Sequence, residues 1–278
     1  MCLAVVCFSG IDTTAKYLNT QMDTVQVVWA RYVFAFLGAL IISNPISHPE
    51  LMRTKRPVLQ LVRSFLLLFA TGANFVALQY LRLDQTVTIG FSTPLMVAAL
   101  AGPFLGEWVG PRRWAAIVVG FLGVVVITRP GFGGIHWAAF LCFTTMIAYA
   151  VYIIITRILS YSDSSATTLF YSNLVGAAAV SLIVPFFWTT PTHWLNMVLM
   201  VFMGACGSIG HYLLILAYRH APTSVVAPFI YTQIVSAIAV GYIFFGDLPD
   251  RWTLIGAAIV IASGLYLLNR ERIRGRAK

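Results

Sequence analysis

Long apolar runs broken by short polar turns dominate the chain. Each run holds roughly 20 mainly apolar residues, enough for a helix to cross about 30 Å of hydrocarbon. Pro, Gly and Asn stand where the runs stop, and no apolar/polar alternation typical of membrane strands is present. We therefore predict an all-α polytopic membrane protein with ten transmembrane helices. The predicted spans are residues 1–19, 24–43, 58–79, 84–105, 111–128, 135–157, 165–187, 194–218, 222–245 and 251–268.

The pattern repeats after half the chain. Gly106 and Glu107 close one span, and Gly246 and Asp247 close another 140 positions later. Similarly, an aromatic residue eight positions before Lys16 has its counterpart eight positions before Arg157, at an offset of 141. We predict a first repeat at 1–130, a second at 135–268 and a basic tail at 269–278. Because five spans per repeat is an odd number, the second repeat is inverted, an architecture common among secondary transporters.

Composition and charge agree with a membrane location. The chain is 59% hydrophobic and only 10% charged, unlike a soluble domain. If the N-terminus is inside, 13 of the 18 Lys and Arg, Arg63 among them, lie at cytoplasmic ends of spans. We therefore expect both termini to face the cytoplasm, with the protein in the inner membrane. The net charge of +9 is explained by these loops and the tail, so we expect lipid contact and no nucleic-acid partner.

Three charged side chains fall inside predicted spans, where they are costly and therefore call for a reason. Asp12 and Lys16 are four residues apart in the first span, the favourable order for a helical ion pair, and Arg31 lies in the second. One interpretation is substrate binding: Lys16 or Arg31 takes a carboxylate or phosphate, and Asp12 meets an amine. The other is internal neutralisation. The repeat places Ser172 opposite Arg31 at offset 141, so the shared scaffold does not require this charge.

Other polar residues occupy the middle of spans. We predict a substrate site that includes them, although interhelical hydrogen bonding is the simpler account of any one alone. Several tyrosines would suit a flat aromatic or cationic ligand. His211 and Asp12 are the candidates for proton coupling. The predicted substrate-binding residues are Asp12, Lys16, Arg31, Asn74, Thr93, Tyr149, Tyr152, His211, Tyr231 and Gln233.

Recurring residues at helix ends are expected to serve the scaffold. Because Glu107 and Asp247 occupy equivalent positions in both repeats, we assign them a structural or gating role rather than substrate contact. Pro94 and Pro228 are predicted to kink their spans. The glycines at 102, 106 and 110 are expected to let helix backbones approach closely.

Several function classes find no support. The chain has no His-Glu-x-x-His or Gly-x-Ser-x-Gly motif, so we expect no enzyme. Its four cysteines show no metal-ligand spacing, and its glycine turns lack a nucleotide-binding pattern, so we expect no metal and no cofactor. The first span is interpreted as a retained helix, since Asp12 and Lys16 replace a signal-peptide cleavage site. A channel-like facilitator remains an alternative mechanism, although no pore-charge ring is evident.

Taken together, these motifs resemble the drug/metabolite transporter superfamily, EamA family. The resemblance rests on the paired repeats, the Lys16 and Arg157 steps, the Ala30-Arg31 step and the Gly106 and Gly246 helix ends. It implies a central cavity lined mainly by the first, third, fourth, sixth, eighth and ninth spans, with the fifth and tenth peripheral. The Phe8-Ser9…Asp12…Lys16 form resembles members linked to S-adenosylmethionine or riboflavin uptake. We expect a secondary carrier for a small polar or amphiphilic metabolite; export of amino acids or related metabolites is the competing role.

Overall fold

The computed structural model describes residues 1–43, 49–106, 110–128, 136–159, 162–220, 229 and 231–276. All regular secondary structure in these ranges is helical. The elements are α1 (Cys2–Leu18), α2 (Thr24–Ser43), η1 (Pro49–Met52), α3 (Pro57–Tyr80), α4 (Leu83–Gly90), α5 (Thr93–Leu105), α6 (Pro111–Thr128), α7 (Trp137–Leu159), α8 (Ser165–Ile183), η2 (Val184–Phe187), α9 (Trp194–His220), α11 (Thr232–Phe245) and α12 (Arg251–Arg276).

Eight segments of the described chain are long and apolar enough to cross a membrane. They correspond to eight of the ten predicted spans. The first predicted span forms α1, which has 17 residues, and the ninth is described only as the 14-residue α11. The prediction of an all-helical membrane protein is therefore confirmed, and the described helices give eight such spans.

The predicted continuous helix at 84–105 is interrupted. It forms α4 and α5, with Pro94 in the first turn of α5. Proline has no N–H to bond the carbonyl four residues earlier, so an unbroken helix would leave Gly90 O without a donor. The hydroxyl of Thr93 donates to Gly90 O at 2.6 Å instead. The side chain next to the proline thus supplies a donor to the carbonyl that would otherwise lack a hydrogen bond in the membrane.

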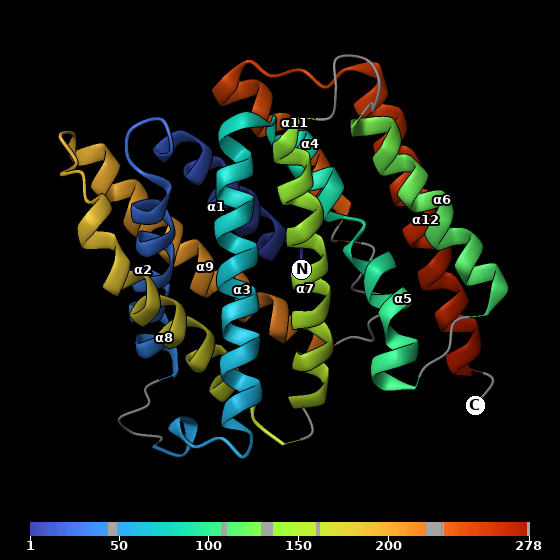
Figure 1. Cartoon of the computed structure of the whole chain (residues 1–278), viewed down its shortest axis with the longest axis horizontal. Coiled ribbons are helices and arrows are strands. Elements are labelled where there is room, and N and C mark those ends of the chain that lie inside the picture. The colour runs from blue at the N-terminus through green and yellow to red at the C-terminus, as the bar shows by residue number, and fades with distance from the viewer. Residues whose placement is uncertain are drawn as a thin grey trace.

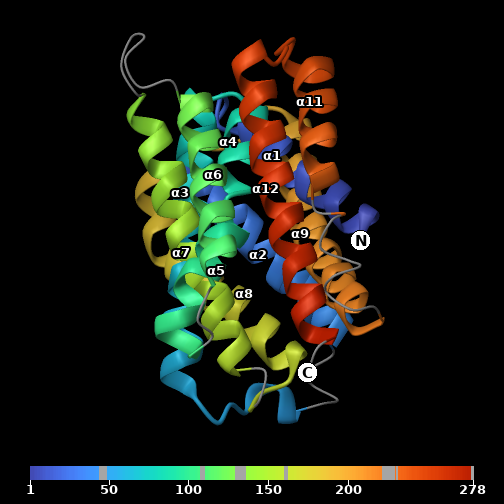
Figure 2. The same ribbon diagram turned by 90° about the vertical axis from the view of Figure 1, so that its right-hand side faces the viewer.

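Helices from the two halves pack on one another in matched pairs. α1 contacts α9 and α11, whereas α7 contacts α3 and α5. In the same way, α2 packs on α9 and α8 packs on α3, while α4 meets α11. α6 and α12 lie side by side along one edge of the bundle (Figures 1 and 2). Every one of these contacts joins a helix of the first half to a helix of the second half.

Two glycines end helices in the same way. Gly106 and Gly246 follow α5 and α11 with φ of 70° and 69°, a left-handed cap that glycine adopts without strain. Our expectation of close backbone approach in this stretch was wrong at Gly106 and Gly110. Apart from chain neighbours and the same helix, no atom of the described residues lies within 4 Å of a Cβ built on either glycine. Close approach occurs instead at Gly204, where a Cβ would lie 2.2 Å from that of Phe34.

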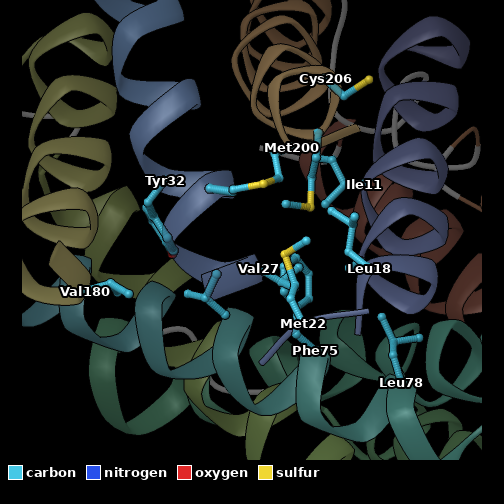
Figure 3. Close-up of a cluster of buried hydrophobic side chains, with 14 of the residues drawn as sticks. Ile11, Leu18, Met22, Val27, Tyr32, Phe75, Leu78, Val180, Met200 and Cys206 are labelled. Carbon is cyan, nitrogen blue, oxygen red and sulfur yellow. The ribbon is translucent and has the colours of Figure 1, made fainter. Parts of the chain in front are cut away.

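A buried apolar cluster ties α1, α2, α3 and α9 together (Figure 3). Leu18, Val27, Phe75 and Met203 are at most 1% exposed. Lipid is as apolar as these side chains, so their close packing rather than a hydrophobic gain holds the helices in place. This cluster fixes the positions of the polar residues on the same helices.

Candidate functional site

Asp12 lies at a meeting point of three helices. Its Oδ1 accepts a hydrogen bond from Asn74 Nδ2 on α3 at 3.3 Å, and its Oδ2 accepts one from Gln233 Nε2 on α11 at 3.4 Å. The structure therefore brings together three residues that lie far apart in the sequence and that we predicted for the substrate site. Both contacts are at the long end of the hydrogen-bond range, so the carboxylate is only loosely held.

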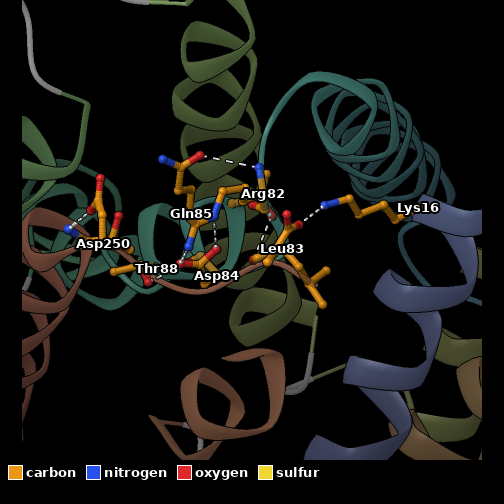
Figure 4. A network of polar contacts seen from close by, with 10 residues as sticks. Lys16, Arg82, Leu83, Asp84, Gln85, Thr88 and Asp250 are labelled. Atoms are coloured by element: carbon orange, nitrogen blue, oxygen red, sulfur yellow. Dashed lines mark hydrogen bonds and ion pairs between the residues drawn. The ribbon is translucent and has the colours of Figure 1, made fainter. Parts of the chain in front are cut away.

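Lys16 does not pair with Asp12, as the four-residue spacing had suggested. Its Nζ lies 2.7 Å from Asp247 Oδ2 and 4.7 Å from the centre of the Phe245 ring (Figure 4). Lys16 is one turn beyond Asp12 and faces the end of α11, where a partly buried carboxylate is available. The ion pair joins the first half of the chain to the second, and among the described residues Asp12 has no lysine partner.

Arg31 is a buried cation with spare hydrogen-bonding capacity. It is 5% exposed, and its guanidinium carbon lies 4.3 Å from the centre of the Tyr32 ring. Its Nη1 has no hydrogen-bond partner in the part of the chain that is described. Arg31 interacts electrostatically with both Asp12 and His211, so α1, α2 and α9 converge on one charged region.

Two more unpartnered polar atoms come from the helices of this region. His211 stands edge-on to Phe8, with ring centres 5.2 Å apart. Its Nδ1 has no partner among the described residues, and neither has the hydroxyl of Ser9, one turn before Asp12 on α1. Buried polar atoms normally have partners, so a polar ligand or water is needed to satisfy them.

Arg63 is the residue that sequence reasoning missed. We had counted it among the cytoplasmic loop charges, but it lies within α3 and is 3% exposed. Tyr152 OH accepts from its Nη2 at 2.7 Å, and Ser172 Oγ accepts from its Nη1 at 2.6 Å. Only its position as the sixth residue of the predicted span at 58–79 could have indicated burial, and that signal is weak because arginines at this depth often extend to the headgroups.

The other predicted residues have separate surroundings. Tyr149 stacks on Tyr152, with ring centres 5.2 Å apart. Tyr231 packs against Phe91 in a second apolar cluster, and its hydroxyl points at Gly264 of α12. The hydroxyl of Thr93 donates to the Gly90 carbonyl at the break between α4 and α5. Glu107 and Pro228, which we expected to act in gating and kinking, lie outside the described residues.

At the end of the bundle that carries η1, Asp163 connects the two halves. Its carboxylate accepts from Gln60 Nε2 at 2.8 Å, from the backbone N–H of Lys55 at 3.1 Å and from the hydroxyl of Thr54. Partial burial alone would raise the pKa of Asp163, but these hydrogen bonds and the charge of Lys55 outweigh it and lower the pKa below 3.8. Asp163 is therefore an ionised link between the start of α3 and the α7–α8 connection.

Asp12 is not the most deeply buried acid. Asp84 is 4% exposed, and both of its oxygens are held by Arg82, at 3.1 and 2.9 Å (Figure 4). A bidentate arginine occupies both oxygens of this carboxylate and leaves it little capacity for a ligand. In the described ranges no group of His, Cys, Asp and Glu could hold a metal ion. An apolar hollow on α9 is lined by Met197, Val198, Val201 and Phe202, none of which carries a polar side chain.

Comparison with known proteins agrees with this architecture. The chain is 28% identical to an S-adenosylmethionine uptake transporter of Rickettsia bellii, over 97% of this chain and 92% of that protein. It is also 28% identical to a riboflavin transporter of Rhizobium johnstonii, over 99% of this chain and 92% of that protein. A crystal structure matches 98% of both chains with a TM-score of 0.63 at 16% identity, which supports the fold.

The family model gives the classification. The model of the EamA-like transporter family matches twice, at residues 1–129 and 136–270. Together the two matches cover nearly the whole chain. The protein therefore belongs to the EamA-like transporter family of the drug/metabolite transporter superfamily.

Proposed function

We propose that this transporter is a secondary carrier of an S-adenosylmethionine-like metabolite, a substrate with both a carboxylate and cationic groups. The observation that carries the proposal is the buried region in which the loosely held Asp12 carboxylate lies within electrostatic reach of Arg31, whose Nη1 has no described partner. Asp12 would bind the ammonium or sulfonium cation, and Arg31 would bind the carboxylate. The transported molecule would leave chemically unchanged.

Relatives support two substrate classes, and the site chemistry favours one of them. Both S-adenosylmethionine and riboflavin transporters resemble this chain. Riboflavin carries neither a carboxylate nor a cationic group, so it would form no charge-paired contact with Asp12 or Arg31. The stacked rings of Tyr149 and Tyr152 suit an adenine or a flavin equally well. Charge is therefore the property that separates the two candidates.

Uptake into proteoliposomes tests the proposal. Radiolabelled S-adenosylmethionine, riboflavin and methionine are compared at matched concentration in the wild type, Arg31→Gln and Arg270→Gln. We expect saturable uptake of intact S-adenosylmethionine, at least tenfold reduced in Arg31→Gln and unchanged in Arg270→Gln, whose arginine is near the surface of α12. Preferred transport of riboflavin, or equal uptake by the two variants, would contradict the assignment. Efflux from preloaded vesicles separates an exporter of amino acids from an importer.

Alternating access through two inverted repeats, each with five membrane-crossing helices, is the mechanism that we propose. The exchange of pairing partners, with α1 on α9 and α11 but α7 on α3 and α5, supports an axis relating the halves. Lys16–Asp247 would close one end and the Asp163 contacts the other, in keeping with a gating role for Asp247. Saturation and counterflow by unlabelled substrate are expected; linear, non-saturating flux would indicate a channel-like facilitator.

Orientation and coupling complete the proposal. Arg53, Lys55 and Arg56 follow η1 at the end of the bundle where α12 also ends, which favours a cytoplasmic location for this end in the inner membrane (Figure 1). A C-terminal green fluorescent protein fusion should fluoresce, and an alkaline phosphatase fusion should be inactive. Asp12 is our candidate for proton coupling. Identical flux with and without an imposed pH gradient would remove that role.

A further inference from the structure

The side chain of Arg63 is surrounded by hydrogen-bond partners from the second half of the chain. Its Nε donates to Thr156 Oγ1 at 2.6 Å, and its Nη1 donates to Thr168 O at 3.1 Å and to Ser172 Oγ at 2.6 Å. Its guanidinium carbon lies 4.4 Å from the centre of the Tyr152 ring. These partners come from α7 and α8. The buried side chain of Arg63 therefore links α3 of the first half to α7 and α8 of the second half.

All of these partners are neutral. No carboxylate of the described chain lies within 4 Å of the Arg63 guanidinium. Asp163, in the α7–α8 connection, accepts instead from Gln60, which is one turn before Arg63 on α3. A buried cation without a counter-charge is expensive, and a neutral glutamine could bridge the same hydroxyls at lower cost. The retained charge therefore points to an anion that is not part of the protein.

The repeat relates this position to Arg31. At an offset of 141, residue 31 of the first half corresponds to Ser172 of the second, whose hydroxyl holds Arg63. Arg31 lies about 10 Å into α2 from one side, and Arg63 about 9 Å into α3 from the other, at 1.5 Å per residue. Both interact electrostatically with Tyr32 and His211, so they border the same central region from opposite sides.

Local pairing of charges indicates the ligand class. Among the described residues the region contains the cations Arg31 and Arg63 and one carboxylate that is free of an ion pair, Asp12. A substrate carboxylate would supply a counter-charge to a guanidinium, whereas the cationic groups of the same substrate would lie at Asp12. We propose that Arg63 is a second carboxylate-binding residue, which receives the substrate carboxylate from Arg31 as the carrier turns toward the side that holds η1. This inference rests on the proposed function, since it assumes a carboxylate-bearing substrate.

Two substitutions at Ser172 test the proposal without removing the buried arginine. Ser172→Asp places a carboxylate against Arg63, where it would occupy the anion site, whereas Ser172→Asn has the same shape and no charge. Proteoliposomes are assayed with S-adenosylmethionine and with its carboxamide, and the ratio of the two uptake rates measures recognition of the carboxylate. Arg63→Gln and the surface control Arg270→Gln are measured in parallel.

We expect Ser172→Asp to be folded, with an unfolding midpoint at or above that of the wild type, and to lose at least tenfold in the carboxylate preference. Ser172→Asn should keep several times more of the preference than Ser172→Asp. Arg63→Gln should lose it as well, and Arg270→Gln should keep it. A wild-type preference in both Ser172→Asp and Arg63→Gln would overturn the role of Arg63; if Arg63→Gln does not fold, the comparison of the two Ser172 variants decides alone. Failure of the wild type to take up S-adenosylmethionine would refute the proposed function instead.

Discussion

The contact between α2 and α9 offers a sharp test, because two glycines one turn apart face different surroundings. A Cβ on Gly204 would lie 2.2 Å from Phe34 Cβ and 2.8 Å from the backbone nitrogen of Ala35. Neither atom can move without the α2 backbone. On Gly207, a Cβ would meet Ala35 Cβ at 3.5 Å, an ordinary contact. Both glycines are buried in α9, so Gly207→Ala is a matched control for Gly204→Ala.

The magnitudes follow from two opposing effects. Replacing glycine by alanine inside a helix gains about 0.5–1 kcal/mol at either position. Overpacking a tight interface costs about 1–3 kcal/mol and applies only to Gly204. We therefore expect Gly207→Ala to be neutral or stabilising and Gly204→Ala to be destabilised by up to about 2.5 kcal/mol net. Because the helix gain is the same at both positions, the variants differ by the overpacking cost of about 1–3 kcal/mol. At about 2–4 °C per kcal/mol, the unfolding midpoint of Gly204→Ala should lie about 2–12 °C below that of Gly207→Ala.

A fluorogenic thiol dye in detergent provides the assay. Cys142 and Cys206 are free and only 3% and 8% exposed, so they react with the dye as the bundle opens. Uptake should fall with Gly204→Ala, because displacing α9 from α2 also moves His211 from Arg31. Equal midpoints for the two variants, or a higher midpoint for Gly204→Ala, would refute the close packing described for these helices.

Three further predictions concern single contacts. A double-mutant cycle of Lys16→Gln and Asp247→Asn should give a coupling of about 1 kcal/mol, since the side chains are 16% and 28% exposed; additive changes in the unfolding midpoint would argue against the ion pair. Asp163 has a lowered pKa, so its contribution to stability is present above pH 3.8 and lost as pH falls through the lower folded value. Below pH 3.8 the wild type should therefore lose more stability than Asp163→Asn, and parallel pH curves would contradict this. Gly246→Ala should cost about 1–2 kcal/mol through backbone strain alone, because φ is 69° and no atom of the described chain crowds the position; an unchanged midpoint would exclude the left-handed cap.

Local patterns predicted most of the secondary structure and pointed to part of the candidate site. The apolar runs indicated the membrane helices because helix length and the absence of water constrain any chain in lipid. Asp12 and Arg31 were recognised because a charge in the middle of an apolar run is conspicuous by itself. The division of 84–105 into two helices was harder to predict. Pro94 marked the place, but a kinked helix and a broken one share the same sequence signal.

The amino-acid sequence by itself therefore determined a membrane protein of packed helices with an internal repeat, and two of the charges within its helices, Asp12 and Arg31, since these depend on composition and spacing along one chain. The tertiary structure alone decided which charges meet. Lys16 forms an ion pair with Asp247 rather than with its helical neighbour Asp12. Arg63 forms hydrogen bonds with residues of α7 and α8 instead of extending to the headgroups. Pairings of this kind depend on how helices from the two halves cross, and that geometry is set by small residues such as Gly204 whose effect appears only when a second helix is packed against them.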